Sequence, residues 1–111
     1  MKAKILATES EKNKGVIGRN NLDNDEMYIF LHVYPDTGFH MRDVGFPISI
    51  AFVDQEFGII NIEELEPESG RAKAPEGTVY AVEAHKDFYK DNQLKSGDFF
   101  KQLYNSLDTN H

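Results

Sequence analysis

The sequence contains no cysteine, no tryptophan and only four prolines among its 111 residues. Without cysteine, disulfides, thiol nucleophiles and cysteine-based zinc sites are excluded. No apolar run approaches the roughly 20 residues that a membrane-spanning helix needs, so we expect no membrane partner. Residues 1–9 carry too short an apolar run for a signal peptide. We therefore expect a cytoplasmic protein.

Positive charge is also scarce. Lys and Arg total 12 against 19 Asp and Glu, which gives a formal net charge of −7. Such a surface repels phosphate backbones, and no basic amphipathic face is present, so we expect neither nucleic-acid nor membrane-surface binding. Acid is concentrated between residues 63 and 68, a run that we interpret as a solvated edge.

Aromatic residues, in contrast, are plentiful, with eight Phe and five Tyr in a chain that is 40% hydrophobic. Large rings supply much of the area that a small core can bury. A chain of this length forms one domain, 1–111. We place its core at about residues 3–101, with 102–111 as a helical or frayed tail.

The N-terminal third predicts a short strand at residues 2–7 and then a helix. Thr8 followed by Glu11 fits a capping box, and the helix would run from about residue 9 to 17 and stop at Gly18. Gly15 inside that helix costs roughly 1 kcal/mol relative to Ala, which suggests a close approach of another group to its backbone.

The middle of the chain alternates apolar stretches with turn signals. Pro35–Gly38 and Asp54–Gly58 carry the residues that tight turns favour. Around these turns we predict four consecutive strands that pair as a meander, at residues 27–34, 39–44, 47–53 and 59–63.

The remaining segments carry fewer strand signals. Residues 66–77 contain two Pro and two Gly with no apolar period, which indicates a long loop of the kind that is either disordered or functional. We predict a strand at 78–84, a helix at 85–92 and a short strand at 99–101. Many strands with few helices indicate a mainly β, single-domain antiparallel β-sandwich or barrel with one to three short helices.

Four short motifs in this order resemble domain-of-unknown-function family 192. The motifs are Gly15-Val16-Ile17-Gly18-Arg19-x-x-Leu22, Met27-Tyr28-Ile29-Phe30, Phe39-His40-Met41-Arg42-Asp43-Val44 and Pro47-Ile48-Ser49-Ile50-Ala51-Phe52-Val53-Asp54, with Tyr80-Ala81-Val82-Glu83 and Gly97-Asp98 following. The resemblance spans about Ile5 to Phe100. It implies a prokaryotic protein with a compact, jelly-roll-like β-sandwich, and it implies no reaction.

The chain departs from this family at polar positions. Members often carry Trp followed by Met-Lys-Asn-Thr where this sequence has residues 40–44, and an Asp where it has Ser49. Their middle loop often contains cysteines and a tyrosine, which residues 66–77 lack, and many members carry an export signal. We therefore assign no catalytic role to Ser49.

The best candidate site comes from His40 and Arg42. On one strand, these residues would point to the same side about 6.5–7 Å apart, close enough to grip one polar ligand. The alternative is an ordinary exposed polar face. Asp43 would point away unless a bulge at Gly45 redirects it.

Two further charged residues are candidates. Arg19 could clamp an anion, although a salt bridge that pins its loop is the preferred interpretation. Glu83 ends a mostly apolar strand and could be a desolvated acid–base group with a raised pKa. Pairing of Glu83 with Arg19 or Arg42 is the preferred interpretation.

A metal site would need several convergent ligands. His32 and His40 flank the Pro35–Gly38 turn, with Asp36 or Asp43 nearby, but no H-x-H or H-E-x-x-H spacing is present. We predict no metal and no cofactor.

Three functions stay open. We prefer a binding module that holds a small polar or anionic ligand through Arg19, His40 and Arg42, together with Asp43 and Glu83, with loop 66–77 as a lid. The alternatives are a small hydrolase or lyase that uses His40 or Glu83 as acid–base, and a protein–protein interaction domain. Nothing in the sequence specifies an oligomeric state.

Overall fold

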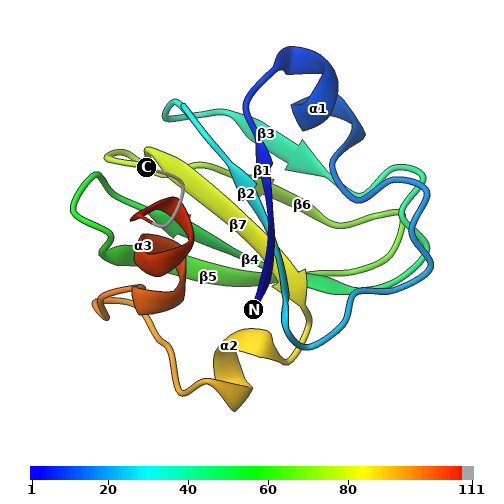
Figure 1. The fold of residues 1–111 in the computed structure, drawn as a ribbon. Coiled ribbons are helices and arrows are strands. Elements are labelled where there is room, and N and C mark those ends of the chain that lie inside the picture. The colour runs from blue at the N-terminus through cyan, green and yellow to red at the C-terminus, as the bar shows by residue number, and fades with distance from the viewer. Residues whose placement is uncertain (109–111) are drawn as a thin grey trace.

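The computed structural model describes residues 1–108, which form seven strands and three short helices (Figure 1). In chain order they are β1 (Lys2–Leu6), α1 (Glu9–Lys14), β2 (Glu26–Phe30), β3 (Gly38–His40), β4 (Ile48–Val53), β5 (Ile59–Leu65), β6 (Arg71–Lys73), β7 (Tyr80–His85), α2 (Phe88–Asp91) and α3 (Lys101–Asp108). Within residues 1–108, no helix is long and apolar enough to cross a bilayer.

The strands form two sheets. The larger has the order β1-β2-β7-β4-β5, and its neighbours are antiparallel except for the parallel pair β1–β2, which α1 connects. The smaller pairs β3 with β6. Because β1 and β5 are free edges, the larger sheet does not close into a barrel. The expected mainly β architecture with few short helices is confirmed, whereas the jelly-roll detail stays a prediction.

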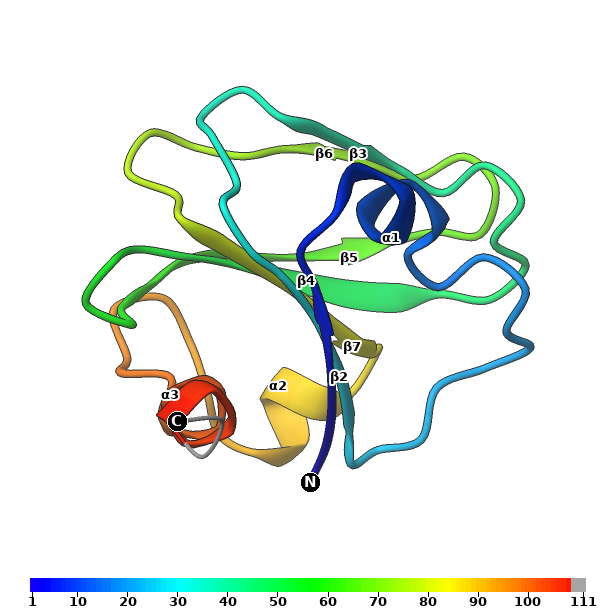
Figure 2. The ribbon, with the colours of Figure 1, turned by 45° about the horizontal axis from the view of Figure 1, so that its top comes forward.

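The larger sheet is the middle of three layers (Figure 2). The β3–β6 sheet and α1 cover one face, which we call the β3/β6 face, and α2 and α3 cover the other, which we call the helix face. Strand β2 shows why both faces are covered: Tyr28 and Phe30 pack into one apolar cluster, Met27 and Ile29 into a second. All six residues of β4 are buried as well, as expected for a strand with apolar side chains on both sides.

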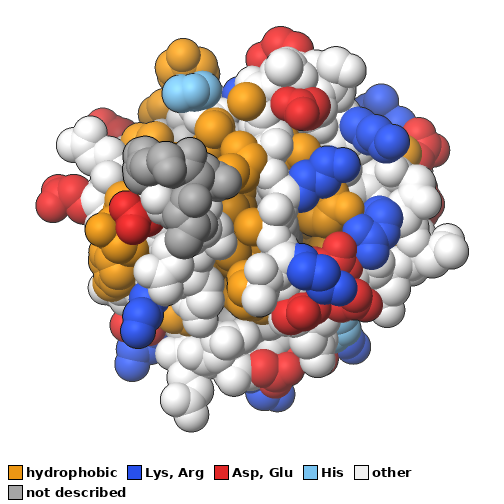
Figure 3. Space-filling model, in the orientation of Figure 1, with side chains coloured by type: hydrophobic (Ala, Val, Ile, Leu, Met, Phe, Trp, Pro, Cys, Tyr) orange, Lys and Arg blue, Asp and Glu red, His pale blue; other side chains and the backbone are white. Residues whose placement is uncertain are grey.

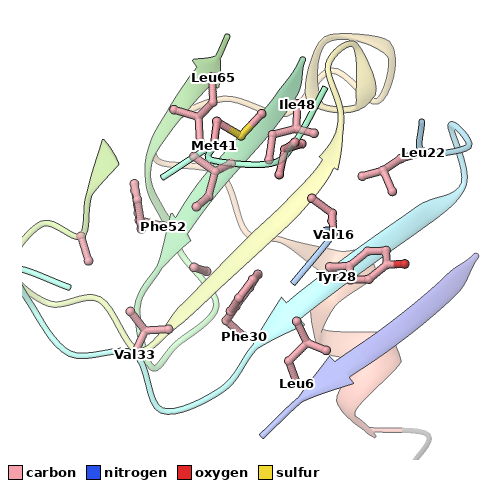
Figure 4. Close-up of a cluster of buried hydrophobic side chains, with 14 of the residues drawn as sticks. Leu6, Val16, Leu22, Tyr28, Phe30, Val33, Met41, Ile48, Phe52 and Leu65 are labelled. Carbon is pink, nitrogen blue, oxygen red and sulfur yellow. The ribbon is translucent and has the colours of Figure 1, made fainter. Parts of the chain in front are cut away.

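The cluster on the β3/β6 face is aromatic at its centre. Phe39 of β3 packs edge-on against Phe30, with ring centroids 5.3 Å apart, and lies 5.7 Å from the ring of Phe52. Val16 and Met41 converge on the same space from the segments that follow α1 and β3 (Figure 4). Phe39 therefore holds the small sheet on the large one.

The helix face is sealed by rings from α2 and the start of α3. Phe88, Tyr89 and Phe100 contact one another with ring centroids 5.0–6.3 Å apart. The Tyr89 hydroxyl donates a 2.6 Å hydrogen bond to the carbonyl oxygen of Val82. The polar end of this buried ring is therefore satisfied.

Helix α1 begins as predicted and ends early. The Thr8 hydroxyl accepts from the Glu11 amide at 3.1 Å and the Glu11 carboxylate accepts from the Thr8 amide at 2.9 Å, so the capping box is confirmed. The helix stops at Lys14 because Gly15 adopts φ +46°, a conformation that side-chain-bearing residues rarely take. The predicted end at Gly18 is wrong.

The predicted four-stranded meander is also wrong. Strand β3 ends at His40, and residues 41–44 form a turn in which Asp43 has φ +65° and the Val44 amide donates to the Met41 carbonyl oxygen. Strand β3 pairs with β6, not with β2. The segment 66–77 thus contains a strand where we expected only loop. This strand forms because β6 pairs with β3, a partner more than 30 residues upstream in the sequence.

Two smaller predictions near the C-terminus differ from the structure. Phe99 makes only an isolated bridge to Gly58 where we expected a short strand, and the predicted helix 85–92 is reduced to α2. Residues 101–108 are helical, as the tail alternative proposed, and the rest of the predicted tail lies outside the described residues.

Burial predicts a sharp contrast between two phenylalanines. Phe52 is fully buried between the two sheets, whereas Phe99 is 54% exposed. We expect Phe52→Ala to lower the free energy of unfolding by about 3–5 kcal/mol and Phe99→Ala by about 1 kcal/mol or less. Urea denaturation of both variants measures the difference, and equal losses would contradict the layer assignment.

Candidate functional site

A cavity of about 420 Å³ lies on the β3/β6 face of the large sheet. The end of α1 and the residues after it form one wall, and β3 with the segment that precedes it forms another. Apolar or aromatic residues and polar residues share its lining about equally. The apolar lining consists of Gly15, Val16, Ile17, Phe30, Val33, Tyr34, Gly38, Phe39, Met41 and Val44, and the polar lining of Glu9, Lys12, Asn13, Lys14, His32, Thr37, His40 and Glu83.

Glu83 is the buried polar group of this cavity. It comes from β7, pairs in register with Tyr28 of β2 and Ile50 of β4, and is only 5% exposed. Within residues 1–108, its carboxyl group has no hydrogen-bond or ion-pair partner. Burial raises its pKa from 4.5 to about 8, because a carboxylate there loses its hydration. At neutral pH, the group is therefore mostly a neutral acid.

Gly15 lies near Glu83. A Cβ atom placed on Gly15 would lie 3.4 Å from the Phe30 ring and 3.9 Å from Oε1 of Glu83. These are ordinary van der Waals distances and Gly15 lies after the helix, so its positive φ and not a close approach explains the glycine. A side chain here would enter the cavity directly above the carboxyl group, besides straining the positive φ.

Basic side chains border the cavity. Lys12 and Lys14 come from the last turn of α1, and His32 and His40 come from the segments on the opposite wall. Nδ1 of His40 accepts a 3.2 Å hydrogen bond from the Arg42 amide, so neutral His40 carries its ring proton on Nε2. Glu9 is the acid on this border.

The structure brings two of the predicted site residues together and separates the others. His40 and Glu83 both line the cavity. Arg42 and Asp43 do not, because the chain turns after His40 and both are exposed. The predicted strand face shared by His40 and Arg42 is therefore wrong. Instead, the Asp43 amide binds the Glu68 carboxylate at 3.1 Å.

Arg19 is occupied by a structural contact. Its guanidinium donates to both Glu26 carboxylate oxygens at 2.8 and 2.9 Å and to the Tyr28 hydroxyl oxygen at 2.6 Å. The hydrogen bonds from Arg19 lower the pKa of Glu26. This fork pins the loop after α1 to β2, as the preferred interpretation held. The expected pairing of Glu83 with Arg19 or Arg42 is wrong.

Sequence reasoning missed three of the basic residues on the border and misjudged the lid. The last-turn position of Lys12 and Lys14 was visible, but their relation to the cavity depends on where α1 packs. His32 was considered only as a metal ligand. Residues 71–73, expected in a mobile lid, are fixed in β6 and lie outside the lining.

No group of three or more acidic or His residues in the described part of the chain is arranged to hold a metal ion. Ser49 lies on the helix face, where its hydroxyl donates to the Lys86 carbonyl oxygen at 2.7 Å. It is separated from Glu83 by the sheet itself, since neighbouring β4 residues alternate between the two clusters.

The raised pKa of Glu83 predicts a pH-dependent stability. Between pH 4.5 and about 8, the folded protein holds a proton on Glu83 that the unfolded chain has lost. The free energy of unfolding therefore falls by about 1.4 kcal/mol per pH unit over this range and levels off above it. Glu83→Gln removes this contribution.

Urea unfolding of the wild type and of Glu83→Gln at pH 5, 6, 7 and 8 tests this. We expect the stability advantage of the variant to grow steadily with pH, since all other titrating groups are common to both proteins. A difference that is independent of pH would show that the carboxyl group is not desolvated.

Comparisons with known proteins place the chain in context. No curated protein matches it. Its fold is similar to that of a protein of unknown function from Novosphingobium aromaticivorans, at 28% identity and a TM-score of 0.77 over 87% of this chain and 71% of the other. It is also similar to a putative transcription regulator from Sinorhizobium meliloti, at a TM-score of 0.79 over 87% of this chain and 78% of the other. The identity of 18% in that second case limits the likeness to the fold.

The family comparison agrees with the motifs along the chain. Residues 1–101 match the profile of the family described as Uncharacterized ACR, so the match includes α1, both sheets and every residue that lines the cavity. The chain belongs to domain-of-unknown-function family 192.

Proposed function

We propose that this protein is a binding module for a small polar or anionic ligand, which occupies the cavity between α1 and β3. The observation that carries the proposal is the Glu83 carboxyl group, which belongs to a buried residue, opens on a cavity of about 420 Å³ and has no partner in the described chain. The two sheets then act as the halves of a sandwich that holds the ligand between its layers.

An unpartnered buried acid is costly. Transfer of a polar group out of water without a replacement hydrogen bond costs on the order of 1–3 kcal/mol in proteins. Most buried polar side chains therefore have partners, and exceptions call for a specific reason. A ligand that binds Glu83 is such a reason, and the cavity volume is within the range of about 300–1,000 Å³ that ligand pockets show.

The charges at the border favour an anion. Lys12, Lys14 and His40 border the cavity against Glu9, in a protein whose net charge is −7. A local excess of basic side chains on an acidic molecule concentrates small anions at this opening. Arg19 and Arg42 have no part in this site, since Arg19 is paired with Glu26 and Arg42 is absent from the lining.

Acid–base catalysis is the second candidate. His40 and Glu83 line one cavity, which is the convergence that an acid–base mechanism requires. A carboxyl pKa of about 8 lies close to the working pH of such enzymes. Product formation during incubation with a bound small molecule would favour this function over simple binding.

An interaction role has a specific observation as well. Phe99 and Tyr104 are exposed beside α3 and contact Phe57, which stacks on Tyr80 with ring centroids 5.4 Å apart. Hydrophobic side chains gather around α3 in Figure 3, while Lys and Arg lie across β1 from them. The presence of a built cavity elsewhere makes ligand binding the better-supported function.

A matched pair of variants tests the proposal. His40 lines the cavity and Arg42, two residues on, does not. We screen small carboxylates and phosphates by thermal shift and expect at least one to raise the melting temperature of the wild type and of Arg42→Ala. His40→Ala should keep its unliganded melting temperature within a few degrees and lose most of that rise.

A ligand response that Arg42→Ala loses and His40→Ala keeps would contradict the assignment of the cavity. A response unchanged in both variants would place binding elsewhere on the molecule.

A further inference from the structure

We propose that Glu83 recognises the ligand as a neutral carboxylic acid that donates a hydrogen bond to an oxyanion, so that the cavity selects small apolar carboxylates over cations of the same shape. This inference rests on the proposed function, and it names the class of ligand and the residue that recognises it.

The position of Glu83 supports a donor role. Its carboxyl group is more than nine-tenths buried, lies within 4 Å of where a Gly15 side chain would enter the cavity, and has no cation near it in the described chain. Without such a cation, the ionised form has nothing to offset its loss of hydration, and the pKa of about 8 reflects this. A neutral acid presents one O–H donor, and hydrogen bonds to an ionised acceptor are the strong ones.

The charged groups around Glu83 determine whether the cavity favours an anionic or a cationic ligand. The titratable groups that line the same cavity are Glu9, Lys12 and Lys14 from α1, His32 and Tyr34 from the segment after β2, and His40 from β3. On the sheet itself, Tyr28 of β2 flanks it with a hydroxyl already engaged by Arg19, and Glu63 of β5 is in register with Ile50. The two lysines outnumber Glu9 among the charged groups of α1 that line the cavity, so the potential there favours an anion over a cation.

The apolar walls of the cavity favour a ligand whose uncharged part is apolar. Phe30, Phe39 and Val33 contribute apolar side chains to the lining of the cavity. An aromatic or aliphatic carboxylate can pack its body there, and burial of that body supplies about 25 cal/mol per Å² of apolar area. A small hydrated anion without an apolar body, such as inorganic phosphate, gains nothing from these walls.

Three probes of one shape and different charge test the inference. Benzoate is an anion, benzamide is neutral and benzamidinium is a cation. Backbone-amide chemical shifts follow each titration at pH 6.5, and at pH 9.5 for benzoate, in the wild type, Glu83→Gln and Glu83→Leu. Glutamine keeps a donor of similar shape, whereas leucine has none.

At pH 6.5, we expect benzoate to shift the amide signals of residues that line the cavity. Benzoate should bind about tenfold more tightly than benzamidinium, because benzamidinium cannot accept the charge-assisted hydrogen bond from Glu83. Glu83→Gln should bind benzoate within about threefold of the wild type, and Glu83→Leu about tenfold more weakly. At pH 9.5, the wild type should lose about tenfold in benzoate affinity while Glu83→Gln changes little. Glu83→Gln also reports any part of the pH effect that comes from His32 or His40.

Two failures are distinguishable. Tighter binding of benzamidinium than of benzoate, or a loss in folded Glu83→Gln as large as in Glu83→Leu, overturns the donor role and leaves a ligand cavity in place. No shift of lining amides with any of the three probes overturns the proposed function itself.

Discussion

A carboxyl group buried without a partner is the constraint around which the site is arranged. Glu83 is the central residue of a row that Tyr28 and Ile50 complete on the neighbouring strands, on a face covered by a second sheet. Burial disfavours the ionised form of this carboxyl group, and Arg19, the partner that the sequence suggested, is engaged by Glu26. The protein therefore holds a neutral acid at neutral pH, with a cavity on its open side.

The three-layer architecture makes this arrangement possible. The helix face is closed by the packed rings of α2 and of Phe100, which directly precedes α3, and the buried Tyr89 hydroxyl is satisfied by a carbonyl oxygen. The β3/β6 face is closed by only two short strands and a six-residue helix that ends at Gly15. The incomplete cover leaves the cavity, and the glycine keeps the space above Glu83 open. The helix face is thus closed by packed side chains, whereas the β3/β6 face leaves the cavity in which we propose that a ligand binds.

Features that depend on residues close together in the sequence were predicted correctly. The capping box of Thr8 and Glu11 formed as predicted, and the apolar stretches of β2 and β4 are buried on both faces. For Glu83, which ends a mostly apolar strand, the sequence offered a desolvated carboxyl group only as the alternative to the preferred pairing with Arg19 or Arg42.

The pairing of strands that lie far apart in the sequence could not be predicted from local residue patterns. Alternation of residues 39–42 suggested one strand face for His40 and Arg42, but β3 ends where its antiparallel partner β6 begins, at the pair His40–Arg71. Nothing near residue 40 reveals that partner, since β6 is short and lies in a segment rich in Pro and Gly. For the same reason, Lys12 and Lys14 could not be assigned to the site before the packing of α1 was known.

The most direct test of this account is the titration of the Glu83 carboxyl carbon itself, followed by ¹³C NMR in the full-length protein, with Glu83→Gln to assign the signal. The account predicts a midpoint near pH 8 in the ligand-free protein, far above the 4.5 of an ordinary glutamate. A midpoint close to 4.5 would mean that the group is hydrated or paired, and it would contradict both the neutral acid and the ligand class inferred from it.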